Sequence, residues 1–122
     1  DTKALAKTHL SGGEPCENAQ GLAAYERLIE ILEREDPALA ASWNLEYALG
    51  TFGALKWYAW KFFENYGETE LAGLYKTVYE CWKQTFQLKK TAHMSSAENR
   101  NAASELLKKA CECENTALQI LA

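Results

Sequence analysis

Apolar residues recur at intervals of three and four along most of this chain, which is the spacing of one face of an α-helix. The clearest repeat lies in residues 71–93, where the apolar stripe consists of Leu71, Leu74, Tyr75, Val78, Tyr79, Trp82 and Phe86. Residues 19–35 show the same pattern. No segment alternates apolar and polar residues as a half-buried strand would. The pattern therefore predicts an all-α fold.

Residues typical of helix ends divide the chain into about five helices. Asp36-Pro37 predicts a turn and a new helix, because Asp accepts hydrogen bonds from the first amides while Pro at the first helical position needs no partner. Gly67 suits the end of that helix. Ser95-Ser96-Ala97-Glu98 has the form of a capping box, which opens a last helix over 95–121. With a short helix over 2–10, the sequence predicts one compact bundle over residues 1–122.

The expected helix over 37–66 is the longest and should lie centrally, because it is apolar on two sides. One stripe comprises Leu45, Ala48, Leu49, Phe52, Leu55, Ala59, Phe62, Phe63 and Tyr66. A second stripe, nearly opposite, is aromatic, and its candidate partner-binding residues are Trp43, Tyr47, Trp57, Tyr58 and the neighbouring Trp60. Surrounding helices would bury both stripes, whereas an exposed stripe would suit a protein-binding hot spot or an apolar ligand groove. Gly50 and Gly53 predict a kink or a close helix crossing in its middle.

Four cysteines are spread along the chain, a number and spacing typical of two disulfides in an oxidising compartment. Cys111 and Cys113 lie about 200° apart on the last helix, so they cannot pair with each other. Cys16 and Cys81 are therefore each expected to pair with one of these two. Such bonds would fasten the last helix on both edges, and the expected location is secreted and extracellular.

Other interpretations of the cysteines remain open. Cys111-x-Cys113 with Cys16, Cys81, His9 or His93 could supply four metal ligands, although the spacing is not that of a zinc knuckle. Four unrelated buried thiols are a further alternative. Glu114 lies in the apolar stripe of the last helix. It is either in a fraying last turn, or a carboxylate that meets a helix or a lysine, or a buried acid with a raised pKa that contacts a ligand.

Composition and charge narrow the classes of function. The chain is 48% apolar with a net charge of −4, so no overall excess of cations favours nucleic acid. Residues 1–70 hold 12 acids and 6 bases, whereas residues 71–122 hold 5 acids and 7 bases, and a surface of both signs suits a protein partner. The apolar stretches are interrupted by charges, so no membrane span is expected. No catalytic or cofactor motif is present, and the sequence predicts neither an enzyme nor a cofactor.

Several short motifs resemble the C-terminal domain of the mosquito salivary 30-kDa allergen family, over nearly the whole chain. The motifs are Trp43-Asn44-Leu45, Lys56-Trp57-Tyr58-Ala59-Trp60, Tyr75 to Tyr79, Glu80-Cys81-Trp82-Lys83 and Cys111-Glu112-Cys113. The resemblance implies the C-terminal domain of a longer secreted protein that binds collagen and masks it from platelet receptors and von Willebrand factor. The acidic Gly-rich region that precedes this domain in the family is missing from these residues.

The expected function is thus a non-enzymatic, secreted collagen-binding inhibitor of platelet adhesion and aggregation. The alternative is a secreted helical carrier that encloses a lipid or another small apolar molecule between the helices over 37–66, 71–93 and 95–121.

Overall fold

The computed structural model describes residues 22–34, 43–94 and 96–122. Four α-helices and no strands occur in these ranges: α2 (Leu22–Arg34), α4 (Trp43–Asn65), α5 (Thr69–Thr91) and α6 (Ala97–Leu121). The all-α prediction is confirmed. The expected helix over 2–10 and the turn at Asp36-Pro37 lie outside the described residues.

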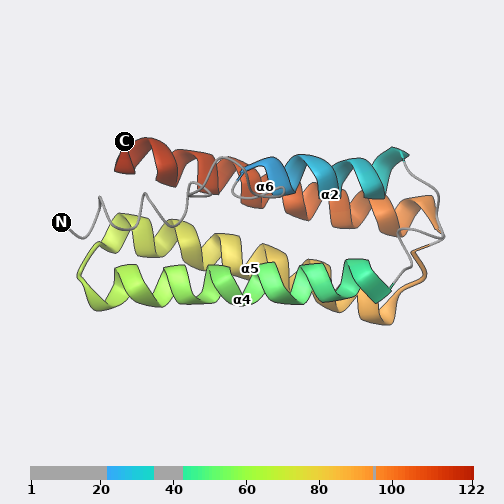
Figure 1. Ribbon diagram of the computed structural model, residues 1–122, viewed down its shortest axis with the longest axis horizontal. Coiled ribbons are helices and arrows are strands. Elements are labelled where there is room, and N and C mark those ends of the chain that lie inside the picture. The colour runs from blue at the N-terminus through green and yellow to red at the C-terminus, as the bar shows by residue number, and fades with distance from the viewer. Residues whose placement is uncertain (1–21, 35–42, 95) are drawn as a thin grey trace.

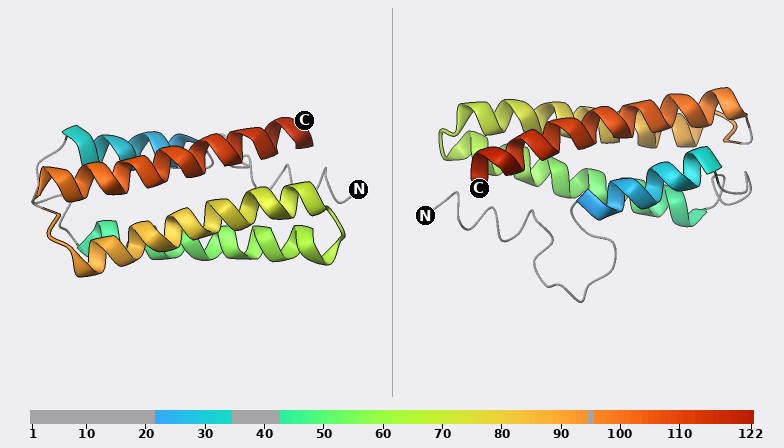
Figure 2. Two further views of the ribbon diagram at one scale, coloured as in Figure 1. Left: turned by 180° about the vertical axis from the view of Figure 1, so that it is seen from behind. Right: turned by 90° about the horizontal axis from the view of Figure 1, so that it is seen from above.

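The helices run side by side along one long axis, with α2 and α6 forming one layer and α4 and α5 the other (Figure 1). The closest packing joins α4 to α5, α5 to α6, and α6 to α2. Both further views show α2 alongside only part of the length of the longer helices (Figure 2). Among the described elements, α4 therefore occupies the edge of the bundle, and the expectation that it lies centrally is wrong.

The position of α4 explains which of its stripes is buried. Leu45, Leu49 and Phe63 are buried in the core, but Leu55 and Tyr66 of the same predicted stripe are exposed. The predicted stripe was wider than the face that the neighbouring helices cover. The two central glycines face α5: a Cβ added at Gly50 would lie 3.3 Å from the Phe86 ring, and one at Gly53 would lie 3.6 Å from Trp82 Cβ. The expected close crossing is therefore the contact between α4 and α5.

The turn between α4 and α5 follows from a single glycine. Gly67 has a φ of +73°, which L-residues with a Cβ rarely adopt. Its amide donates to the Glu64 carbonyl at 3.2 Å, and the Glu68 amide donates to the Phe63 carbonyl at 3.0 Å. These two hydrogen bonds form a Schellman motif, which ends α4 and lets α5 return antiparallel beside it.

The start of α6 lies one residue later than the capping-box prediction. Ser96 is the N-cap, and its hydroxyl accepts from the Asn99 amide at 3.5 Å. Asn99 in turn donates through its side chain to the His93 carbonyl at 2.9 Å. The cap therefore uses an Asn at the third helical position in place of the expected Glu98.

Candidate functional site

A polar cluster lies in the core where all four described helices meet. It consists of Tyr25 from α2, Lys56 from α4, Tyr75 and Trp82 from α5, and Glu114 from α6, and is called the Glu114 cluster below. The Glu114 side chain is 0% exposed, and the Lys56 ammonium lies 2.9 Å from its Oε1 and 3.0 Å from its Oε2. Of the three interpretations of Glu114, the structure matches the carboxylate that meets a lysine.

Hydrogen bonds surround this ion pair. The hydroxyls of Tyr25 and Tyr75 donate to the two Glu114 carboxylate oxygens at 2.7 and 2.8 Å, and Trp82 Nε1 donates to the Tyr25 hydroxyl at 2.8 Å. The Lys56 ammonium also lies over the rings of Tyr25 and Trp82, at 5.6 and 5.8 Å from their centroids. Burial first, and the Glu114 charge second, raise the pKa of both tyrosines, which keeps them protonated as donors.

The Glu114 cluster joins all four described helices in the core. Each polar side chain in it has a partner within the cluster, and neither described pocket is lined by Glu114 or Lys56. A substrate would have to displace core side chains to reach it. Sequence reasoning missed Lys56, although the residue lies four positions after Phe52 and seven before Phe63 on the buried face of α4.

The surface of α4 carries the exposed aromatic residues. Tyr47, Trp57 and Tyr58 are 62%, 38% and 65% exposed, and we call them the aromatic face. The rings of Trp57 and Tyr58 meet edge to face with their centroids 5.2 Å apart. Tyr47 lies eleven residues before Tyr58, so it points to the same side of the helix. The second predicted stripe is thus exposed at these three positions.

The other two candidates differ from these three. Trp60 is half-buried and turns toward α5, where its ring stacks on the Tyr79 ring with the centroids 5.8 Å apart. The Lys61 ammonium lies over the Trp60 ring, 4.0 Å from its centroid. Trp43 is the first residue of α4, and its side chain lies outside the described part of the structure. The structure therefore brings Trp57 and Tyr58 together and directs Trp60 into the seam between α4 and α5.

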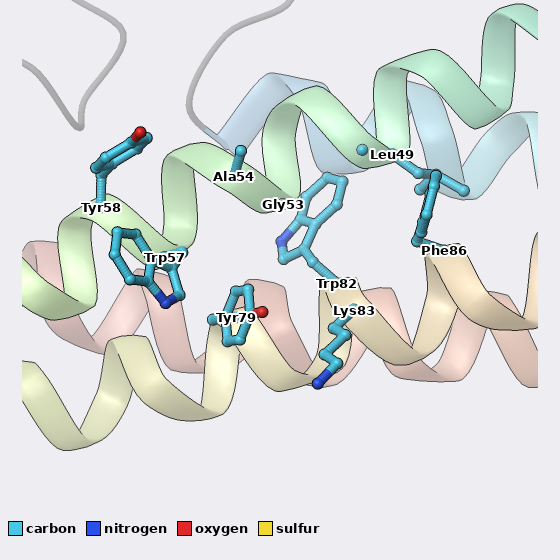
Figure 3. A pocket seen from close by; sticks show the side chains of 10 residues that line it. Leu49, Gly53, Ala54, Trp57, Tyr58, Tyr79, Trp82, Lys83 and Phe86 are labelled. Carbon is cyan, nitrogen blue, oxygen red and sulfur yellow. The ribbon is translucent and has the colours of Figure 1, made fainter.

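A groove of about 520 Å³ runs beside the aromatic face, between α4 and α5. Gly53 and Ala54 of α4 lie between Trp57 at one end and Phe86 at the other, and Tyr79 and Lys83 of α5 form the opposite wall (Figure 3). Lys83 is the only charged residue among those that line this groove. Sequence reasoning placed Tyr79 and Phe86 in the core and Lys83 in solvent, so it missed this wall.

The cysteines differ from the prediction. Cys81, Cys111 and Cys113 carry free thiols, and no disulfide occurs among the described residues; Cys16 lies outside them. Here α6 is held by side-chain packing, by the Glu114 cluster, and by Glu33 of α2, which accepts from Lys108 and Ser104 at 2.7 Å each. Burial raises the pKa of the Cys81 thiol, and burial with the nearby Glu114 raises that of Cys111, so both are poor nucleophiles.

Neither a metal site nor a membrane span is found in the described ranges. No group of three or more His, Cys, Asp or Glu side chains there could hold a metal ion. None of the described helices combines the length and the hydropathy needed to cross a membrane. Comparison of the sequence with protein-family models, with curated proteins and with solved structures finds no match in any of the three.

Proposed function

We propose that this chain is a secreted, non-enzymatic protein that binds an extracellular protein partner through the aromatic face of α4. The single observation that carries the proposal is the exposure of Tyr47, Trp57 and Tyr58 on one side of a long helix. Large aromatic side chains usually contribute to a core, and a row of them left in water is typical of an interaction surface. Trp and Tyr are also the residues most enriched in binding hot spots.

Contacts of Trp57 with its neighbours support the proposal. The Trp57 ring is held between the edge-to-face contact with Tyr58 and the Lys61 ammonium, which lies 5.9 Å from its centroid. Side chains already fixed in this way lose little conformational entropy when a partner binds. Trp57 and Tyr58 therefore already have neighbours that favour their positions before a partner binds.

Fibrillar collagen is the partner to test first. The motif resemblance to the mosquito salivary 30-kDa allergen family supports this choice, and it implies that the chain masks collagen from platelet receptors and von Willebrand factor. A triple helix has a continuous, rod-like surface. An elongated aromatic row, which extends eleven residues or about 16 Å along α4 from Tyr47 to Tyr58, can lie along such a rod.

One observation favours a second candidate, a carrier of a small apolar molecule. The groove between α4 and α5 has a volume of about 520 Å³ and is lined largely by aromatic side chains. This volume is within the usual range for small-molecule sites. The space between α4, α5 and α6 is occupied by the Glu114 cluster and its apolar neighbours. A carried molecule would therefore sit in the groove at the surface.

Surface plasmon resonance on immobilised fibrillar collagen tests the first candidate, and native mass spectrometry of the purified protein tests the second. We expect saturable collagen binding that Tyr58→Ala weakens at least tenfold. Tyr66→Ala is the matched control, because Tyr66 is as exposed as Tyr58 but lies outside the aromatic face. Both variants should keep the wild-type thermal transition. No collagen binding, together with a co-purifying lipid, would reject the collagen proposal in favour of the carrier.

Secretion would expose the cysteines to oxidants, and we propose one pairing for the oxidised protein, although Cys81, Cys111 and Cys113 carry free thiols in this structure. Ser104 and Lys108, which precede Cys111 by seven and three residues, contact Glu33 of α2, so Cys111 lies on the α2 side of α6. Cys113, about 200° away, lies on the α5 side, where Cys81 is. A Cys81–Cys113 disulfide would leave Cys111 for Cys16. Peptide mapping of the secreted protein under non-reducing conditions tests this; a Cys81–Cys111 peptide would contradict it.

A further inference from the structure

Three lysines form a regular row on α5 beside the groove. Lys76, Lys83 and Lys90 are seven residues apart, so they lie on one side of the helix and are spaced by about 10.5 Å. Tyr79 and Phe86 are also seven residues apart and alternate with the lysines along the same side. This side of α5 therefore has a heptad repeat of aromatic and cationic side chains, of which Tyr79, Lys83 and Phe86 line the groove and Lys76 and Lys90 flank it.

The facing wall on α4 consists of small residues next to Trp57. Its residues between Trp57 and the end of the groove are Gly50, Gly53 and Ala54, which follow the three- and four-residue spacing of a helix seam. Small residues at such a seam let a neighbouring helix approach closely. Gly50 to Trp57 is seven residues or about 10.5 Å, which is the length of two helical turns. Gly50 and Gly53 pack against Phe86 and Trp82 of α5, so the open part of this wall is the exposed Ala54 beside Trp57.

The lysine row is not neutralised by the described part of the chain. No ion pair of Lys76, Lys83 or Lys90 occurs there; Lys76 lies over the Trp60 ring at 5.8 Å, and Lys90 over the Phe86 ring at 5.3 Å. Glu64, at the far end of this seam, is already paired with Lys61 at 3.3 Å. The charged side chain on the groove wall itself is Lys83, which is positive, although the whole chain is negative at −4 and the exposed Glu80 lies between Lys76 and Lys83 on α5. Complementarity requires an acidic partner.

We infer that the groove between α4 and α5 binds an acidic amphipathic helix of a protein partner. Apolar side chains of that helix lie over Ala54 between Trp57 and Phe86. Its carboxylates recur every seven residues opposite Lys76, Lys83 and Lys90, as charged residues do at the flanks of coiled-coil seams. A single anionic headgroup would need one lysine, whereas three lysines spread over about 21 Å match an elongated partner. The inference goes beyond collagen binding, since it concerns a helical partner and the wall of α5, although the groove shares Trp57 and Tyr58 with the aromatic face.

The test uses a designed probe and the full chain. The probe is a three-heptad peptide with Leu and Ala at the seam positions, Glu at the flanks, and no aromatic residues, so that protein tryptophan fluorescence reports binding. One control peptide has Lys in place of Glu, and another has the same composition in scrambled order. We expect only the acidic heptad peptide to bind, with amide shifts in NMR spectra centred on Gly53, Ala54 and Lys83. Its affinity should fall at least tenfold between 50 and 500 mM salt, because salt screens the exposed charges.

Two variants locate the site without disturbing the core. Lys83→Glu should weaken binding at least tenfold, whereas Lys109→Glu, on the exposed surface of α6, should not. Ala54→Trp should block the peptide, because Ala54 is exposed and lines the groove, so the added ring fills it without displacing core residues. Equal binding of the scrambled peptide, no binding of the acidic peptide at 1 mM, or an unchanged affinity of Ala54→Trp would overturn the inference. Occupation of the groove by oleate or by a second copy of the chain in place of the peptide would overturn it as well. None of these outcomes depends on whether collagen binds.

Discussion

Replacing Glu114 with Met isolates the energetic role of the ion pair in the core. The substitution keeps a side chain of similar length but leaves the Lys56 ammonium, whose side chain is 9% exposed, without its counter-charge. Loss of one partner of a buried pair costs about 3–5 kcal/mol. The hydroxyls of Tyr25 and Tyr75 lose their acceptor at the same time, and each buried unpaired donor adds about 1–3 kcal/mol.

These costs are large against the stability of a domain of this size, which is about 5–15 kcal/mol. We expect Glu114→Met to lower the free energy of unfolding by at least about 4 kcal/mol and the melting temperature by roughly 15 °C. Urea denaturation followed by circular dichroism measures the first, and calorimetry the second. The matched control is Glu105→Met on the exposed side of α6, which should change the free energy by no more than about 0.5 kcal/mol.

The double variant Lys56→Met/Glu114→Met sharpens this test. It removes both charges, so no orphan ion remains, and replacing a buried pair with apolar residues is often neutral or stabilising. We therefore expect the double variant to be more stable than Glu114→Met alone, and most of its remaining loss to come from the two tyrosine hydroxyls. Additive losses from the two single variants, or a loss below about 1 kcal/mol for Glu114→Met, would refute a buried and coupled pair.

Three further predictions concern the buried tyrosines, Glu33 and the cysteines. The pKa values of Tyr25 and Tyr75 are raised above 10.0, so the stability that they contribute below pH 10 should fall as the pH rises beyond it. Absorbance at 295 nm should show two tyrosines that ionise only when the protein unfolds. In the Tyr25→Phe/Tyr75→Phe variant, no tyrosine should ionise in this way. Hydrogen bonds from Lys108 and Ser104 lower the pKa of Glu33. The stability that Glu33 contributes above pH 4.5 should therefore be lost as the pH falls through the lowered pKa. NMR titration of the Lys108→Ala variant should show a higher Glu33 pKa than in the wild type. Iodoacetamide should modify buried Cys81 more slowly than Cys113 in the folded protein but not in urea, and equal folded-state rates would contradict its burial.

Helices with one apolar face were predictable from the sequence, because such a face can be buried in only one way. The stripe over 71–93 corresponds to α5, Thr69–Thr91, and Gly67 ends α4 as its position indicated. The position of α4 was not predictable, because a helix that is apolar on two sides fits the centre or the edge of a bundle equally well. Leu55 and Tyr66 are exposed only because no described helix packs on their side of α4.

The Glu114 cluster shows that charged residues within apolar stripes can predict which helices pack together. Lys56 was treated as an interruption of an apolar stretch, and Glu114 was left with three interpretations. Each lies on the buried face of its own helix, and the two have opposite charge. A pair of opposite charges on two core faces predicts that those faces meet, since each would otherwise be buried without a partner. The partners from α2 and α5 were not predictable in this way, because Tyr25 and Tyr75 are apolar enough to be buried without the carboxylate.

The same cluster limits where function can lie. It uses one side chain or more from every described helix, so the relative positions of these helices are fixed by interactions that leave no polar group in the cluster unpaired. A core of this kind has no vacant polar atom to offer a substrate, and its rearrangement would break several hydrogen bonds at once. The exposed aromatic side chains lie elsewhere, on α4 at the edge of the described bundle. The edge position that contradicts a central α4 is also what leaves Tyr47, Trp57 and Tyr58 accessible to a partner.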